Sequence, residues 1–476
     1  MKRILSAVLV VLLAFSATGL LAYADESVPA GSVASITTSE GQKSYYPSLA
    51  DALKVLQPAA MYDGAILDIL QDVTCAFWWD GTVNQSSSNV IQSANVIING
   101  NGHTVTVGTD CGNSSKNFLV FPNGIQINDL TLVLLSGGGL RFNGGGCTLN
   151  QVNITVKDVT GVKGGVLADG TTGNPSKAFV TFYVGNGSSS AIQINGGRFA
   201  QENSGERVVD GKAGIADIDI IDASFIGGSE FRMYSVLSGS DLYVKNCYFD
   251  KSFITGGTTN FVGAVTLESS IVLASTAVGS GIIVNSGIWF NTRNKTVSIY
   301  GENGLGCFAP ELISMQDGAS VRLHPETSGI RFTSDISEKM RELAGSVSGM
   351  TVEYGTLVVR KDQLGDVEFT VDSMTAAGIK FVECKAEAGM DENGSTYRAA
   401  IIGIPQTDYG NDICARSYVR LTVGSKTVYL YSDYSEESNC RNIREVAGAA
   451  LQAHESGEIT YSEAELAILR GYAAAE

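Results

Sequence analysis

Short runs of alternating apolar and polar residues fill the first two thirds of the chain, and they come in pairs. An apolar strand, a turn with Asn, Asp or Gly, and a second apolar strand recur at 125–133, 148–156, 191–199, 218–225 and 242–249. The closing aromatics of three repeats are spaced 26 and 24 residues apart, at Phe199, Phe225 and Phe249. Strands repeating at this period without intervening helices predict a stack of coils, each burying its apolar face against the next.

The residues at the turns and strand ends have two interpretations. Side chains at equivalent places in stacked coils lie about one strand spacing apart, so amides can bond along a ladder and aromatic rings can stack. We therefore expect ladders at Asn128, Asn150, Asn195, Asp222 and Asn246, and an internal stack of the three phenylalanines. The alternative is a sugar-binding role for both groups.

The repeat fades after 283–290 and 297–300, and the composition changes near Gly318. Beyond it, helical patterns at 336–343, 441–453 and 462–474 accompany longer strands, which is typical of an α+β module. The predicted organisation is a signal peptide at 1–24, a β-helix at 25–316 and an α+β domain at 317–476. A helix that begins near Ser48 is expected to cap the first coil.

The first 24 residues have the features of an export signal. Lys2 and Arg3 precede an apolar run at 4–15, and Ala22-Tyr23-Ala24 supplies a small-residue cleavage site. We expect a secreted or cell-surface protein with no membrane insertion after cleavage; an uncleaved anchor is the alternative.

Charge and cysteine content exclude several classes of partner and site. The net charge is −17, with 44% hydrophobic and 17% charged residues, and no basic cluster is present. This excludes nucleic acid and anionic membrane surfaces as partners. The eight cysteines form no CxxC pair, so no zinc site is predicted. Bridges between Cys414 and Cys440 or between Cys75 and Cys111 are open, as is a purely apolar role for single cysteines.

Three parts of the chain resemble known proteins. Ile97-Ile98-Asn99-Gly100-Asn101-Gly102-His103-Thr104-Val105 resembles right-handed parallel β-helix proteins of the pectate-lyase-like superfamily, and 45–53 through 69–74 resembles the opening segment of secreted or surface proteins of Gram-positive bacteria. The segments 319–323, 329–332, 353–357, 415–419 and 444–447 resemble a C-terminal domain of unassigned function in secreted clostridial proteins. The resemblance implies a mainly β fold, a right-handed parallel β-helix with a C-terminal α+β domain. Leucine-rich repeats, which share the period, lack the β-branched character seen here.

Enzymes on this scaffold need groups that are hard to find in this chain. A lyase would use calcium-holding carboxylates and a base, and a hydrolase would use clustered aspartates with a Gly-His-Gly element. The candidates are Asp217, Asp219 and Asp222 with Arg232; alternation places Asp217 and Asp219 on the outer face. Glu206, Arg207 and Asp210 form a second, less specific group. No motif specifies calcium, so no cofactor or metal is predicted.

Two further groups could bind a ligand without catalysis. Trp78 and Trp79 are adjacent, so one ring of a strand pair would face outward and could stack on a sugar; packing over the first coil is the alternative. Arg322, Arg331 and Arg416 could receive an anion, or form internal ion pairs.

Two functional hypotheses follow from these patterns. The first is a noncatalytic, adhesin-like extracellular β-helix protein that binds a polysaccharide, matrix or cell-surface glycan. The second is a divergent polysaccharide lyase or glycoside hydrolase that acts on acidic polysaccharide.

Overall fold

The computed structural model describes most of the chain between residues 28 and 474. The described ranges are 28–58, 61–75, 90–107, 117–121, 123–135, 138–142, 146–157, 182–184, 191–202, 204, 207–211, 217–233, 241–253, 264–279, 281–386 and 390–474. The predicted signal peptide, Trp78, Trp79, Glu206 and Cys111 lie outside these ranges.

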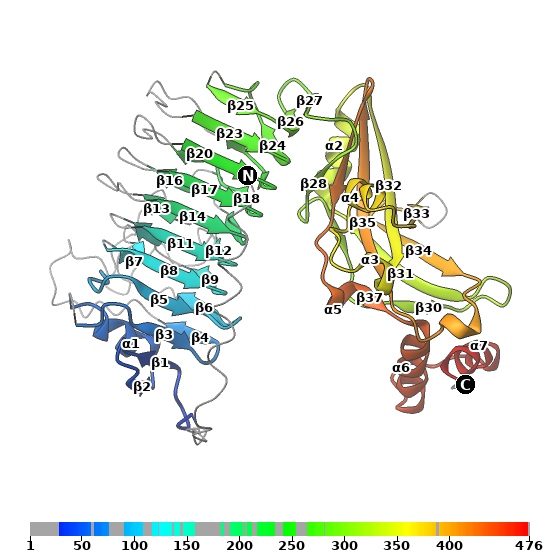
Figure 1. Ribbon diagram of the computed structural model, residues 1–476, viewed down its shortest axis with the longest axis horizontal. Coiled ribbons are helices and arrows are strands. Elements are labelled where there is room, and N and C mark those ends of the chain that lie inside the picture. The colour runs from blue at the N-terminus through cyan, green and yellow to red at the C-terminus, as the bar shows by residue number, and fades with distance from the viewer. Residues whose placement is uncertain are drawn as a thin grey trace, which may run out of the picture.

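The amino-terminal part is a parallel β-helix, as predicted, built from three sheets (Figure 1). Successive coils visit sheet A, then sheet B, then sheet C. In spatial order sheet A contains β2 (Lys43–Tyr46), β1 (Ala34–Thr37), β3 (Ile66–Ile69), β5 (Val96–Asn99), β8 (Ile125–Asn128), β11 (Cys147–Asn150), β14 (Ile192–Asn195), β17 (Ile218–Ile221), β20 (Asp241–Lys245), β23 (Ala264–Glu268) and β25 (Ile282–Val284).

The other two sheets stack with the same coil order. Sheet B contains β4 (Val73–Cys75), β6 (Thr104–Val107), β9 (Thr131–Leu134), β12 (Asn153–Val156), β15 (Arg198–Gln201), β18 (Ser224–Gly227), β21 (Tyr248–Phe249), β24 (Ser270–Ala274), β26 (Gly287–Asn291) and β27 (Thr296–Tyr300). Sheet C contains β7 (Asn117–Phe121), β10 (Gly138–Phe142), β13 (Phe182–Val184), β16 (Val209–Gly211), β19 (Glu230–Met233) and β22 (Ser252–Phe253). The predicted aromatic stack is confirmed: Phe225 lies 5.1 Å from Phe199 and 5.0 Å from Phe249 between ring centroids, all three buried.

A two-residue turn joins several strands of sheet A to sheet B, for example β8 to β9, β17 to β18 and β20 to β21. Its first residue has a positive φ, for example 47° at Asp129, 56° at Asp222 and 52° at Asn246. Asp and Asn tolerate this left-handed backbone, and their side chains support turns. The second position requires glycine at Gly197, where a Cβ would lie 2.2 Å from the carbonyl oxygen of Val152.

The predicted capping helix is confirmed as α1 (Leu49–Val55). The Ser48 hydroxyl accepts the backbone N–H of Asp51 at 3.1 Å, which satisfies one of the free donors of the first turn. Leu49, Ala52 and Leu53 are buried against the first coil. The antiparallel strands β1 and β2 cover the adjacent edge of sheet A.

The C-terminal part is the predicted α+β module. Sheet D contains β28 (Leu305–Phe308), β36 (Lys426–Tyr431), β35 (Ile413–Val423), β32 (Met350–Arg360) and β33 (Val382–Lys385), with β37 (Cys440–Arg441) beside β35. Sheet E contains β29 (Ile313–Met315), β30 (Ser320–Arg322), β31 (Gly329–Ile336) and β34 (Thr396–Ile402). The helices are α2 (Glu338–Ser346), α3 (Lys361–Leu364), α4 (Val371–Ala376), α5 (Glu436–Asn439), α6 (Ile443–Glu455) and α7 (Glu463–Ala473), with the 3₁₀ turn Gln406–Asp408. Within the described residues, no helix is both long and apolar enough to cross a bilayer.

The module packs on the outer face of the last coils of sheet B. Ile271, Leu273 and Ile288 of the β-helix share one buried cluster with Val419 and Leu430 of sheet D. All five residues of β24 are consequently buried, because both of its faces are covered. Two ion pairs also cross this contact: Arg198 with Glu311 at 2.8 Å, and Lys339 with Asp250 at 4.0 Å.

The cysteines take both of the predicted roles. Cys414 of β35 and Cys440 of β37 form a disulfide, while Cys147, Cys247 and Cys307 are free and buried. The second predicted bridge involves Cys111, which is outside the described residues.

Candidate functional site

A polar ladder runs along the outer face of sheet A. The Nδ2 of Asn128 donates to Asn99, that of Asn150 to Asn128, and that of Asn195 to Asn150, each at 2.8 Å from the acceptor Oδ1. Asn99 extends the ladder to Asp68 at 2.9 Å. These amides therefore bond to one another, as predicted for a structural ladder.

The five predicted residues all bond between coils, but they belong to two ladders. Asn195 lies opposite Ile221, and Ile221 lies opposite Lys245, so the amide ladder ends at Asn195. Asp222 and Asn246 stand one residue later, at the left-handed turn position, where Asn246 Nδ2 donates to Asp222 Oδ1 at 3.1 Å. Two adjacent ladders exist in place of one.

The predicted acidic candidates lie along sheet A and its turns. Asp217 is exposed just before β17, and its Oδ1 accepts the backbone N–H of Asp241 at 3.1 Å. Asp219 lies on the outer face, level with Tyr243 of the next coil. The Tyr243 hydroxyl donates to Glu268 at 2.7 Å, and burial, followed by Glu268 and Asp219, raises the pKa of Tyr243 to about 12.

Arg232, the fourth candidate, belongs to a different sheet. It lies on β19 of sheet C, and its Nε is 3.7 Å from Glu230 Oε1. Arg207 contacts the same carboxylate oxygen at 2.5 Å. Arg232 is thus grouped with Arg207 and Glu230, whereas Asp217 and Asp222 bind groups of the next coil of sheet A and its turn. Within the described ranges, no cluster of three His, Cys, Asp or Glu residues could hold a metal ion.

Arg416, one of three arginines considered for anion binding, has an internal role. Its guanidinium donates to the carbonyl oxygens of Ser432 and Phe369 at 2.9 and 3.0 Å, and it stacks 4.9 Å from the ring centroid of Tyr431. Burial lowers the pKa of this guanidinium. Backbone carbonyls and an aromatic ring therefore hold Arg416, whereas we had expected an internal ion pair.

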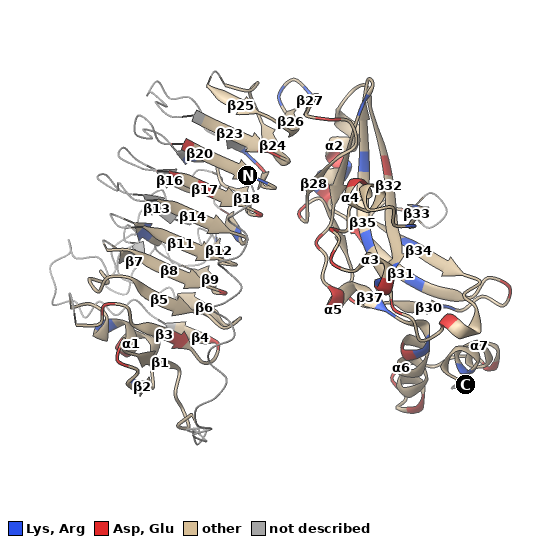
Figure 2. Ribbon diagram, viewed as in Figure 1, with Lys and Arg blue, Asp and Glu red and all other residues tan. Residues whose placement is uncertain are grey.

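The other two arginines meet a third on the outer face of sheet E. Along β31, Ile330 and Phe332 are buried, whereas Arg331 points to the opposite, partly exposed face. Strand pairing adds Arg322 of β30 and Arg398 of β34 to that face, because Arg322 lies opposite Gly329 and Arg398 opposite Thr333. We call Arg322, Arg331 and Arg398 the arginine row. Figure 2 marks Lys and Arg positions in blue along the ribbon, including among the strands of the C-terminal part.

Among the residues that the structure describes, the arginine row has no carboxylate counter-ion. None of its members forms an ion pair with another residue that the structure describes. Arg331 Nε donates a hydrogen bond to the Ser320 hydroxyl at 3.0 Å. Burial, then the positive charges of Arg398 and Arg322, lowers the pKa of Arg331. Three guanidinium groups are therefore close enough to repel one another, and an anion would relieve that repulsion.

Spacing makes the row linear. Each step moves one strand across the sheet and two residues along it, and such diagonal neighbours lie about 7–8 Å apart. Planar guanidinium groups bind carboxylate, sulfate or phosphate through two parallel hydrogen bonds. The sequence signal for Arg398 was its position between the buried residues Tyr397 and Ala399, but only strand pairing places it beside Arg331.

No protein-family model, curated protein sequence or solved structure matches this chain.

Proposed function

We propose that the protein is a noncatalytic extracellular binding protein, adhesin-like in use, that recognises an acidic polysaccharide or cell-surface glycan. The observation that carries this proposal is the arginine row: three guanidinium groups without ion-pair partners among the described residues, in a chain of net charge −17. Most of the surface of so acidic a protein repels polyanions. The arginine row differs locally, because its positive charges attract anionic groups.

The row favours a linear polymer over a small anion. The three backbone positions are about 7–8 Å apart, so the row is longer than one carboxylate, whereas a chain of uronate residues presents carboxylates repeatedly. Screening confines charge effects to about 8 Å at physiological ionic strength, so the acidic remainder of the protein does not cancel the row at contact distance. The proposed setting is the cell surface or the medium, in agreement with the predicted export signal.

Binding to polygalacturonate tests the proposal, with the fully methyl-esterified polymer as the uncharged control. Replacing Arg398 by Ala removes one charge-assisted contact, worth about 1.5–3 kcal/mol, and should weaken binding about ten-fold or more. Arg470→Ala is the matched control, because Arg470 is an exposed arginine on α7, paired with Glu463 at 3.7 Å.

Two results would contradict the proposal. Equal affinity for the charged and esterified polymers would show that carboxylates are not recognised, and equal affinity of the Arg398→Ala variant would remove the row from the site. Release of unsaturated or reducing ends from polygalacturonate would support the lyase or hydrolase hypothesis, and Asp219→Asn would then be the first catalytic variant to assay.

A further inference from the structure

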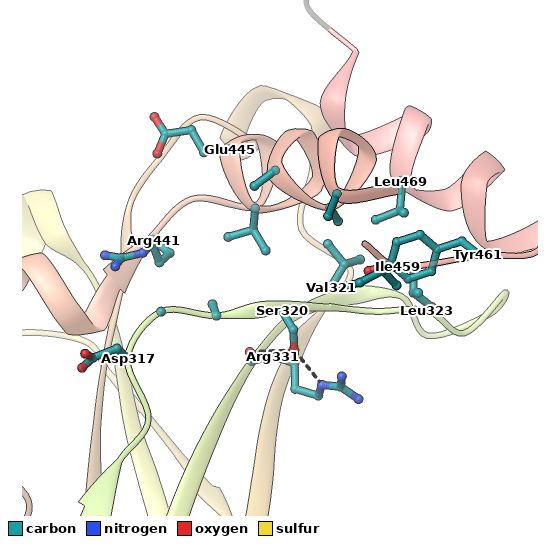
Figure 3. A pocket seen from close by; sticks show the side chains of 16 residues that line it. Asp317, Ser320, Val321, Leu323, Arg331, Arg441, Glu445, Ile459, Tyr461 and Leu469 are labelled. Atoms are coloured by element: carbon teal, nitrogen blue, oxygen red, sulfur yellow. Dashed lines mark hydrogen bonds between the residues drawn. The ribbon is translucent and has the colours of Figure 1, made fainter. Parts of the chain in front are cut away.

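A cavity of about 570 Å³ lies between α6, α7 and β30 (Figure 3). One part of its wall is apolar and includes Val321, Leu323, Ala450, Ile459 and Leu469. The volume is within the range of about 300–1,000 Å³ that small-ligand sites occupy. The cavity is therefore large enough for a small ligand, and it is separate from the ladders of sheet A.

Three charged side chains line this cavity, Asp317, Arg441 and Glu445; Arg331 also borders it, but its guanidinium points to the other face of sheet E. Figure 3 shows Asp317, Arg441 and Glu445 toward one end and the apolar residues toward the other. Arg331 donates to Ser320, and Arg441 donates to the backbone oxygens of Glu437 and Cys440. Within the described part of the chain, Asp317, Arg441 and Glu445 form no ion pair, and the two carboxylates accept no hydrogen bond. Charges of both signs are thus free to meet a ligand.

The strand beside the cavity has a free edge. Among the described strands β30 pairs with β31 only, and Gly318, Ala319, Ser320 and Val321 line the cavity. An unpaired strand edge carries N–H and C=O groups that can bind an extended chain. Peptides commonly bind proteins in this way, with side chains entering adjacent pockets.

We propose that this cavity binds a short extended peptide with an apolar side chain. Its backbone lies along the free edge of β30, and the apolar side chain packs on Val321 and Leu469. Its ammonium group meets Asp317 or Glu445, and its carboxylate meets Arg441. The proposal goes beyond glycan binding and does not depend on it.

Other ligand classes fit these groups less well. A fatty acid would match the apolar wall and one arginine, but it would leave two carboxylates without a partner. A sugar would leave the apolar wall without matching surface. A short peptide with both terminal charges and an apolar side chain matches the apolar wall, the carboxylates and Arg441.

Calorimetric titration of the full-length protein with trileucine tests the proposal. N-acetyl-trileucine amide, which lacks both terminal charges, is expected to bind at least about ten-fold more weakly. Ala450→Phe fills the apolar wall and should abolish measurable binding. Ala467→Phe is the matched control, because Ala467 is exposed on α7 and does not line the cavity; its affinity should equal that of the wild type.

A second variant tests the proposal even if Ala450→Phe does not fold. Glu445→Gln changes an exposed side chain, so it should fold normally, weaken trileucine binding about ten-fold and leave the blocked peptide unaffected. Absence of heat from trileucine at about 10 mM, equal affinity for the blocked peptide, or unchanged binding by both variants would overturn the proposal. Arg398→Ala should weaken polygalacturonate binding only, so the two proposals can fail separately.

Discussion

The amide ladder of sheet A allows a stability prediction in which two substitutions remove different numbers of hydrogen bonds. Asn150 sits in its middle: it donates to Asn128 and accepts from Asn195, both at 2.8 Å. Asn195 ends the ladder because Ile221 occupies the equivalent place in the next coil. Asn150→Ala therefore removes two hydrogen bonds, whereas Asn195→Ala removes one.

A neutral side-chain hydrogen bond contributes about 1 kcal/mol to stability. All three asparagines are half-buried, so water can reach part of the groups left behind. We expect Asn150→Ala to lower the free energy of unfolding by about 2 kcal/mol and Asn195→Ala by about 1 kcal/mol. Gln193→Ala is the control, because Gln193 is exposed on the same face and forms no hydrogen bond with a described residue; its effect should stay within about 0.5 kcal/mol.

Urea unfolding of the four proteins, followed by far-UV circular dichroism and by tyrosine fluorescence, measures these differences. Coincidence of the two signals is required, since a chain of this size can unfold in more than one step. An Asn150→Ala effect equal to that of Gln193→Ala would refute the structural ladder. An Asn195→Ala effect as large as that of Asn150→Ala would refute the claim that the loss of stability follows the number of ladder hydrogen bonds removed. Loss of polygalacturonate binding in Asn150→Ala, with stability unchanged, would instead favour a sugar-binding role.

Three further predictions concern the aromatic core, the disulfide and the alkaline limit. Phe225→Ala should lower the free energy of unfolding by about 3–5 kcal/mol, with a smaller loss for Phe225→Leu; equal losses in urea unfolding would contradict tight stacking. The double change of Cys414 and Cys440 to Ala opens a loop of sequence separation 26 and should cost about 3 kcal/mol, a loss that a reductant should reproduce in the wild type but not in the variant. Because the pKa of Tyr243 is raised from 10.0 to about 12 in the folded state, its stabilising contribution is complete below pH 10 and is lost as the pH rises toward 12. Unfolding measured at about pH 9 and pH 11 should therefore show a smaller fall in stability for Tyr243→Phe than for the wild type, and identical falls would contradict the assignment.

Much of the β-helix was predictable because its signals are local. The alternation of apolar and polar residues fixes which side chains point inward, and the closing phenylalanines fix the coil register that the structure confirms. The ladder was harder, since Asn and Asp serve equally at the last strand position and at the left-handed turn position. Only the backbone register separates Asn195 from Asp222.

The arginine row shows where local signals stop. Alternation marks Arg331 and Arg398 as outward-facing, but pairing of β31 with β34, about 70 residues apart in the chain, makes them neighbours. Whether an arginine meets a carboxylate, a carbonyl or solvent depends on surfaces that the chain brings together from distant segments. Arg416 and Arg331 looked alike in sequence, yet one is buried beneath carbonyls and the other faces outward.

The sequence by itself determined the coils, the capping helix and the α+β character of the C-terminal module, because each follows from patterns a few residues long. Tertiary structure alone decided which face of sheet B the module covers, where the arginine row forms and that a cavity remains beside β30. The physical reason is that strands and helices follow from neighbours along the chain, whereas packed surfaces and cavities follow from how well distant faces fit one another.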